Sequence, residues 1–205
     1  MKSSVFAIDN GLDGYCCFLQ ADGTVKQAAT PVARGRVSRS VLHLEKADSG
    51  IDYRPLRMLQ LIDIAIAADP DVAFVIEEPS VGFKAGESSR KSRDSQMRGF
   101  GMWCAAVAIR ERLLYTVYST TWKSYFKLIG KPKDKSIAIA QALYPGCVFP
   151  THDAADACLI ATFFKSGVEI EVRPRNARQK TRTGLVPPAG RSSRGRKNKG
   201  TSDSA

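Results

Sequence analysis

Two short apolar runs, each ending in an acid, most constrain the fold of this 205-residue chain. SSVFAID occupies residues 3–9, and VAFVIEE occupies residues 72–78. Both runs are continuously apolar at their centres, which is typical of strands that are buried on both faces of a sheet. We therefore predict a sheet that contains both runs and is flanked by helices.

The other segments complete an α/β pattern around these two strands. After the turn NGLDG, the segments YCCFLQ and TVKQAAT predict two strands joined by the hairpin signal ADGT, and LLYTVYS predicts one more. The spacing of apolar residues predicts helices at residues 55–68, 90–112, 120–126, 134–144 and 152–164. The series predicts an α/β fold in which an antiparallel meander feeds a mixed five-stranded sheet.

The positive charge of the chain is concentrated in residues 171–205. This segment contains ten Lys and Arg against two acids, and so carries +8 of the net charge of +11. It is rich in Pro, Gly and Ser and has too little apolar surface to offset the entropy of ordering, so we expect a disordered basic tail. The folded domain is then expected at residues 1–170. A net charge of this size favours a polyanionic partner, with nucleic acid ahead of an anionic membrane.

The cysteines and the apolar runs indicate the compartment. The five cysteines form no CxxC pair and no zinc-binding spacing, so we interpret them as reduced core residues of a cytoplasmic protein. MKSSVFAIDN leads directly into a strand pattern, so no signal peptide is expected. No apolar run approaches the roughly 20 residues that span a bilayer, so we expect no membrane partner.

Four acids are expected to converge on one site. Asp9 and Glu77 end the two buried strands, and a right-handed crossover would make those strands parallel neighbours with both acids at one sheet edge. Asp153 and Asp156 are three residues apart and so share a helix face. Four carboxylates repel one another in a low dielectric, and divalent cations resolve that repulsion. Oxygen ligands suit Mg²⁺, with Mn²⁺ as a substitute, and a pair of such ions is suited to phosphodiester cleavage.

Each acid also has a structural interpretation. Asp9, followed by Asn-Gly, is compatible with a plain turn, and Glu77 with a solvated strand end. Asp153 or Asp156 is compatible with a helix cap or a first-turn acid. The order of the four acids and their apolar surroundings favour the metal site.

The order of five short motifs now identifies a family. The chain resembles the RuvC-like Holliday-junction resolvases of the ribonuclease H-like superfamily, including phage and plastid members, over roughly residues 3–165. The segments VFAIDNGLDGYCCFL and FVIEEPS are similar to the family's first two strands and to its strand with the catalytic glutamate. The matching segments further along the chain are RGFGMWCAAVAIRERLLYTVYSTTWKSYFKL, KPKDKSIAIAQALYP and HDAADACLIA.

The resemblance assigns roles to individual residues. It implies that the four catalytic, metal-binding acids are Asp9, Glu77, Asp153 and Asp156. His152 precedes the third acid and is either a ligand in its place or a helper near the attacking water.

Two lysines complete the implied catalytic set. The resemblance places basic residues at Lys123 and Lys135, where each would bind the scissile phosphate or stabilise the developing charge. A solvated helix lysine is the alternative for both.

The sequence departs from the family's pattern at three places. Asn10 replaces the usual proline after the first acid, and Asp13 lies nearby as an outer ligand or a residue without a role. The aromatic residue that stacks on an opened base in the bacterial enzymes has no clear counterpart. Ser80 occupies about that place, with Phe83 the nearest aromatic residue.

The function implied is a Mg²⁺-dependent endonuclease that resolves four-way DNA junctions by paired phosphodiester hydrolysis. The twofold symmetry of the junction implies a homodimer. A basic, compact resolvase suggests that the protein acts on nucleoid or phage DNA in the cytoplasm. The alternatives are a ribonuclease H-like nuclease for other branched DNA, duplex DNA or structured RNA, and a catalytically inactive nucleic-acid-binding module. A related actin-like ATPase is disfavoured because the chain is too short for two lobes.

Two further segments have expected roles in such an enzyme. The loop at residues 81–95 carries Lys84, Arg90, Lys91 and Arg93, which we interpret as DNA-binding residues above the site. The helix at 95–112 is a candidate dimer interface through its apolar residues Met97, Trp103 and Val107; that stripe is equally suited to be plain core.

Overall fold

The structure, a computed structural model, describes residues 3–34, 51–79 and 87–167. The side chains of residues 33–34, 51–52 and 87–92 lie outside that description. The basic tail expected at residues 171–205 also lies outside the described residues, so the domain boundary near residue 170 stays a prediction.

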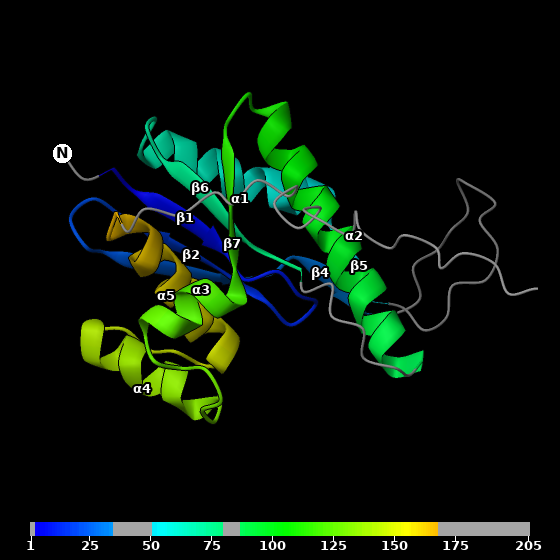
Figure 1. Ribbon diagram of the computed structural model, residues 1–205. Coiled ribbons are helices and arrows are strands. Elements are labelled where there is room, and N and C mark those ends of the chain that lie inside the picture. Colours follow the sequence, from blue (N-terminus) through cyan, green and yellow to red (C-terminus); the bar gives the residue numbers. More distant parts are fainter. Residues whose placement is uncertain (1–2, 35–50, 80–86, 168–205) are drawn as a thin grey trace, which may run out of the picture. The chain divides into compact units, whose positions relative to one another are not determined.

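Five strands form a mixed sheet in the order β3-β2-β1-β6-β7 (Figure 1). Their bounds are β1 Val5–Ile8, β2 Tyr15–Leu19, β3 Val25–Ala29, β6 Ala73–Glu78 and β7 Leu114–Tyr118. β1 and β3 are both antiparallel to β2, whereas β6 is parallel to β1 and β7 is parallel to β6. The expected mixed five-stranded sheet with flanking helices is confirmed.

The turns between the first three strands also follow the sequence signals. Gly23 has a φ of 93° at the tip of the β2–β3 hairpin, a left-handed conformation that favours glycine. A second sheet of two short strands, β4 (Val32–Arg34) and β5 (Ile51–Tyr53), was not expected. Strands of three residues are too short to give a periodic apolar pattern.

One face of the main sheet is covered by α1 (Pro55–Ala68) and α2 (Glu87–Ile109). α1 begins with a proline at its first turn, and it buries Met58, Ile62 and Ala65, which recur at helical spacing. These side chains form one core with residues on the facing strands.

The opposite face carries α3 (Ser119–Tyr125), α4 (Asp134–Leu143) and α5 (His152–Lys165) (Figure 1). α5 is the central helix of this layer, because it contacts β1, β2, β3 and β6 as well as α3 and α4. Residues 154–161 of α5 are all buried. A helix that is buried all round belongs to the interior of the fold.

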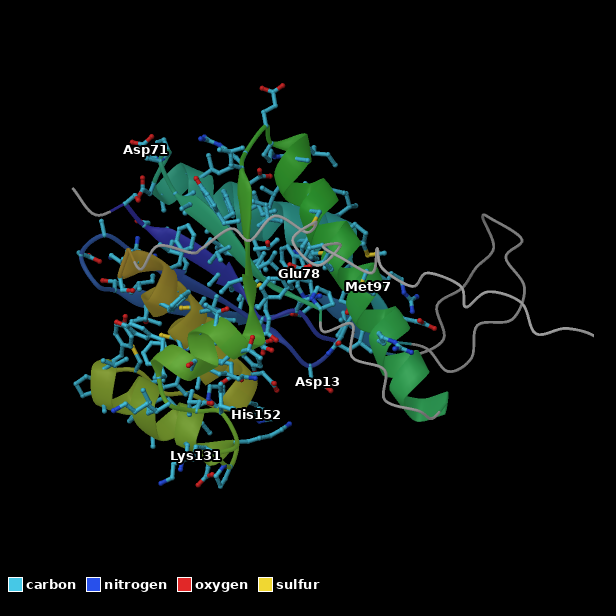
Figure 2. All side chains as sticks on the ribbon, viewed as in Figure 1. Asp13, Asp71, Glu78, Met97, Lys131 and His152 are labelled. Atoms are coloured by element: carbon cyan, nitrogen blue, oxygen red, sulfur yellow. The ribbon has the colours of Figure 1, made fainter. Side chains whose placement is uncertain are left out.

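The expectations about α2 are met in part. The helix expected at residues 90–112 is present but begins earlier, at Glu87, so the second half of the loop expected at residues 81–95 is helical and Arg93 lies on α2. The candidate interface fails for Trp103 and Val107, because both are fully buried in the chain's own core. Met97 is 48% exposed on α2 (Figure 2).

No helix in the described ranges is both long and apolar enough to cross a bilayer.

Candidate active site

Asp9 and Glu77 lie side by side at one edge of the sheet. Ile8 of β1 pairs with Ile76 of the parallel strand β6, so the next residue of each strand is an acid. Side chains alternate between the two faces of a strand. Because Ala7 and Val75 belong to the core under α5, the acids two residues further on point to that same face.

The first turn of α5 brings two more acids to this edge. Thr151 caps the helix, since its side-chain oxygen accepts a hydrogen bond of 3.1 Å from the backbone N–H of Ala154. The cap fixes the start of the helix, and Asp153 and Asp156 follow in its first turns. Asp156 is buried, whereas Asp153 and His152 are partly exposed.

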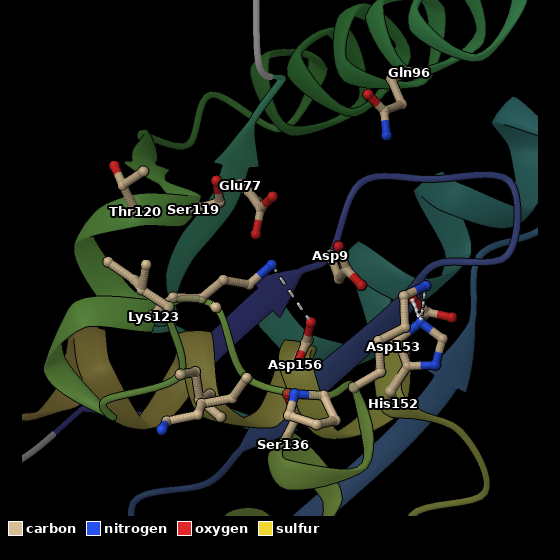
Figure 3. A pocket seen from close by; sticks show the side chains of 16 residues that line it. Asp9, Glu77, Gln96, Ser119, Thr120, Lys123, Ser136, His152, Asp153 and Asp156 are labelled. Atoms are coloured by element: carbon tan, nitrogen blue, oxygen red, sulfur yellow. Dashed lines mark hydrogen bonds and ion pairs between the residues drawn. The ribbon is translucent and has the colours of Figure 1, made fainter. Parts of the chain in front are cut away.

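The four acids face one cleft of about 440 Å³ (Figure 3). Asp9, Glu77, Asp153 and Asp156 all line it, together with His152 and Lys123. The sequence-predicted acids are therefore brought together from three separate segments. An adjoining hollow of about 410 Å³ shares Asp9, Asp153 and His152 with the cleft. Asp13 lines this second hollow and does not line the cleft.

The pKa values of three of the acids in the cleft are raised, partly because the acids lie close together. Burial, and then the charges of Glu77 and Asp156, raise the pKa of Asp9 well above its ordinary value. Asp153 adds to this rise and Lys123 opposes it. Asp9 still has partial exposure, which is toward the cleft.

Burial is also the main reason that the pKa values of Glu77 and Asp156 are raised. Lys123 counters the rise at both carboxyls, and a side-chain hydrogen bond from Ser136 counters it at Asp156. These three carboxyls therefore lose their protons less readily than free carboxyls, and positive charge in the cleft would counter the rise in their pKa values.

α3 supplies two contacts to these acids. The indole N–H of Trp122 donates a 2.8 Å hydrogen bond to Oε2 of Glu77. The ammonium of Lys123 lies 3.9 Å from Oδ2 of Asp156 and 4.9 Å from the centre of the Trp122 ring. Trp122 is fully buried, so the hydrogen bond holds Glu77 against a fixed side chain.

Lys133 and His152 form a second polar group at the cleft. Nε2 of His152 lies 2.9 Å from Nζ of Lys133 and 3.1 Å from Oδ1 of Asp153. One ring nitrogen accepts a hydrogen bond from the lysine or donates one to the carboxylate, but it does not do both at once. Nε2 of His152 therefore hydrogen-bonds to either Lys133 or Asp153, depending on the tautomer of the ring.

The predicted basic residues are placed less uniformly. Lys123 lines the cleft, but Lys135 is exposed on α4 and is not among the lining residues. Lys133, two residues earlier, lines the cleft in its place. Lys84 and the side chains of Arg90 and Lys91 lie outside the described residues. Arg93 is partly exposed on α2 and is not among the lining residues of the cleft.

Trp122, Lys133 and Ser136 were not expected as site residues. The sequence signal that could have identified Trp122 is its position next to Lys123 on the short helix α3. In the structure, both side chains contact acids of the site. Lys133 and Ser136 flank Lys135 in the segment KPKDKS, so only the structure decides which of these residues faces the cleft.

The loop after β1 fixes the position of Asp9. The backbone N–H of Asp9 donates a 2.9 Å hydrogen bond to the carbonyl of Tyr15, and this bond closes the turn. A side chain at Gly14 would collide with the carbonyl oxygen of Asp9, so the turn requires glycine there. Asn10, which stands where the family's proline was expected, donates a 2.9 Å hydrogen bond from Nδ2 to the carbonyl of Gln96. The Asp9 turn is thus tied to α2.

The chemistry of the donor set fits a divalent cation. The four acids offer oxygen ligands only, and Oδ1 of Asp156 is buried without a hydrogen-bond partner among the described residues. Over the described ranges, no three His, Cys, Asp or Glu side chains already form a ligand group. The carboxylates are therefore gathered in one cleft without being closed around an ion.

Comparisons with known proteins give likenesses of structure. No protein-family model and no curated protein sequence matches the chain. Thermus thermophilus RuvC in complex with a Holliday junction substrate is similar, with 13% identity and a TM-score of 0.47 over 77% of this chain and 90% of that one. A second Thermus thermophilus RuvC structure has 14% identity and a TM-score of 0.45 over 77% and 90%. The yeast mitochondrial Holliday junction resolvase Ydc2 has 16% identity and a TM-score of 0.40 over 80% and 78%. The expected resemblance to RuvC-like resolvases is found at the level of the fold.

Proposed function

We propose that the protein is a Mg²⁺-dependent endonuclease that resolves four-way DNA junctions. The observation that carries the proposal is the cleft, in which Asp9, Glu77, Asp153 and Asp156 converge from three segments. Burial and mutual repulsion raise the pKa values of three of these acids. Gathering these acids in one cleft costs free energy of folding, and cations bound in the cleft would offset that cost.

The four acids would hold two Mg²⁺ ions, or Mn²⁺ as a substitute. When bound, the ions would supply Lewis-acid stabilisation for phosphodiester hydrolysis. Glu77 is held for this purpose by Trp122, and Asp156 by its contact with Lys123. The ammonium group of Lys123 would also bind a phosphate oxygen from the opposite wall of the cleft. Lys131 and Lys133, which line the cleft as well, would bind the adjoining DNA backbone.

Junction resolution is the form of nuclease activity that the five sequence motifs support. Their order, from the Asp9 strand to the α5 acids, is that of the resolvase family, and the net charge of +11 suits a branched polyanion. A four-way junction needs two opposed cuts, so we expect a homodimer on the DNA. Sedimentation of the protein with and without a junction tests this, and a monomer bound to the junction would contradict it.

The test of the reaction is a panel of four substrates with and without Mg²⁺. Four-way junction, three-way junction, linear DNA duplex and structured RNA are incubated at equal concentration. We expect paired cuts in the four-way junction, with 5′-phosphate and 3′-hydroxyl products, that cease in chelator. Equal cutting of the linear duplex would reject junction resolution in favour of a general nuclease of the same fold.

A pair of matched variants separates an enzyme from an inactive binding module. Asp156→Asn removes one charge from the cleft, whereas Asp71→Asn removes one at the opposite end of β6 (Figure 2). We expect Asp156→Asn to abolish cleavage and to keep or strengthen junction binding, because the cleft then repels phosphate less. Asp71→Asn should leave both unchanged. A protein that binds junctions but never cuts them, with or without either change, would be the inactive module.

A further inference from the structure

A tight turn that lines the cleft carries an apolar side chain, and lysines lie on either side of it in the sequence. The backbone N–H of Lys131 donates a 3.0 Å hydrogen bond to the carbonyl of Leu128, which makes Ile129 and Gly130 the central residues of a β-turn. Gly130 has a φ of 72°, as the third position of a type II turn requires. The geometry places Ile129 at the tip.

The turn is anchored at its base and exposed at its tip. Leu128 is buried in the core under α5, and its N–H donates a 2.7 Å hydrogen bond to the carbonyl of Lys123. Ile129, by contrast, is 59% exposed. A single exposed apolar residue is ordinary on a protein surface. Ile129 differs because it lines the same cleft as the four acids.

The neighbours of Ile129 are suited to a nucleic acid chain. Lys131 and Lys133 line the cleft beside it, and Lys127 is exposed at the start of the turn. Lysines bind phosphates, while the faces of the bases are the main apolar surface that a nucleic acid offers. A protein partner would need an apolar patch of several residues, whereas this tip is one side chain among charges.

We propose that Ile129 is an apolar wedge that contacts the base step next to the cleavage site and unstacks it. Apolar side chains act in this way in proteins that kink DNA. The proposal rests on the proposed nuclease function and adds a residue that determines which steps are cut. Steps that unstack easily, such as pyrimidine–purine steps, should be preferred.

The control for Ile129→Ala is Val148→Ala. Val148 is also a β-branched apolar residue in a loop, it is 82% exposed, and it does not line the cleft. Both changes remove exposed methyl groups from the surface, so neither should alter the melting temperature. A difference between the two variants on DNA therefore reports the position of the side chain in the cleft.

The first measurement is the fluorescence of 2-aminopurine placed at the cleavage step of a junction. All proteins carry Asp156→Asn so that the DNA stays uncut. We expect binding to raise the fluorescence, Ile129→Ala to remove at least half of that rise, and Val148→Ala to leave it unchanged. An equal rise with all three proteins would overturn the proposal.

The second measurement is cleavage in the background of active protein. We expect Ile129→Ala to cut a fully paired junction about tenfold more slowly, and to recover when the cleavage step is mismatched in advance. An equal loss on paired and mismatched DNA would indicate a structural role and reject the wedge. If binding raises the fluorescence and Ile129→Ala removes that rise, but the unchanged protein cuts no substrate, the nuclease function fails while the base contact of Ile129 stands.

Discussion

Trp122→Phe tests whether α3 holds Glu77 in place. The indole N–H of Trp122 donates a 2.8 Å hydrogen bond to Oε2 of Glu77, and the ring is fully buried. Phenylalanine keeps an aromatic ring in the core and a face for Lys123, but it has no N–H. The change therefore removes the hydrogen bond and a small part of the ring volume.

The chain supplies a matched control for the lost volume. Trp103 is also fully buried, and its indole nitrogen has no hydrogen-bond partner among the described residues. A hydrogen bond to a charged group contributes about 1.5–3 kcal/mol. We expect Trp122→Phe to lower the free energy of unfolding by about that much more than Trp103→Phe does. For a domain of this size the difference in melting temperature is about 3–12 °C.

The assays are urea denaturation of both variants at neutral pH and a pH profile of cleavage. Because the Trp122 hydrogen bond lowers the pKa of Glu77, its loss should raise that pKa and move the acidic limb of the profile to higher pH. Trp103→Phe should leave the limb in place. Equal destabilisation by the two changes, with no movement of the limb, would refute the role assigned to Trp122.

Two further substitutions, one control substitution and one change of conditions test the site. Gly14→Ala should destabilise the protein by about 1–3 kcal/mol and reduce cleavage, because the new methyl group meets the carbonyl of Asp9. Gly101→Ala on α2, where nothing lies within 4 Å, should instead stabilise by about 0.5–1 kcal/mol, and equal effects in denaturation would contradict the geometry. Thr151→Ala should cost about 0.5–2 kcal/mol through the lost cap of α5, and an unchanged urea midpoint would exclude that. In chelator, the free energy of unfolding should fall as pH rises above about 4, because three carboxyls with raised pKa values hold more protons in the folded state. Mg²⁺ should reverse this fall in thermal melts, and a pH-independent stability would refute it.

The fold was predictable because its elements carry strong local patterns. The run around Asp9 and the run around Glu77 are apolar enough to be buried strands, and one is parallel to the other as expected. Their acids could be placed together because parallel strands end at the same edge of a sheet. α1 occupies residues 55–68 as predicted, because a proline marks its start and the apolar spacing defines its length.

The details of the site depend on tertiary contacts that no local pattern encodes. Trp122 and Glu77 are 45 residues apart, so their hydrogen bond follows only from the packing of α3 beside β6. The choice of Lys133 over Lys135 depends on the path of the chain between α3 and α4. Lys127 has a φ of 56°, a left-handed conformation that redirects this segment and that is uncommon outside glycine. The burial of Trp103 could not be separated from an interface role by helical spacing alone.

α5 joins the stability of the fold to the geometry of the acids. Its first turns place Asp153 and Asp156 at the cleft, and its later turns bury Leu159, Ile160 and Phe163 in the core. Burial of three such side chains contributes about 5–9 kcal/mol as an upper figure. This apolar burial offsets the repulsion among the carboxylates and holds them together before any cation arrives. Under the proposed function, a metal ion would then be needed for the chemistry of the cleft and not for the folding of the helix. This is the reverse of small metal-binding domains, in which the ligands come together only around the ion.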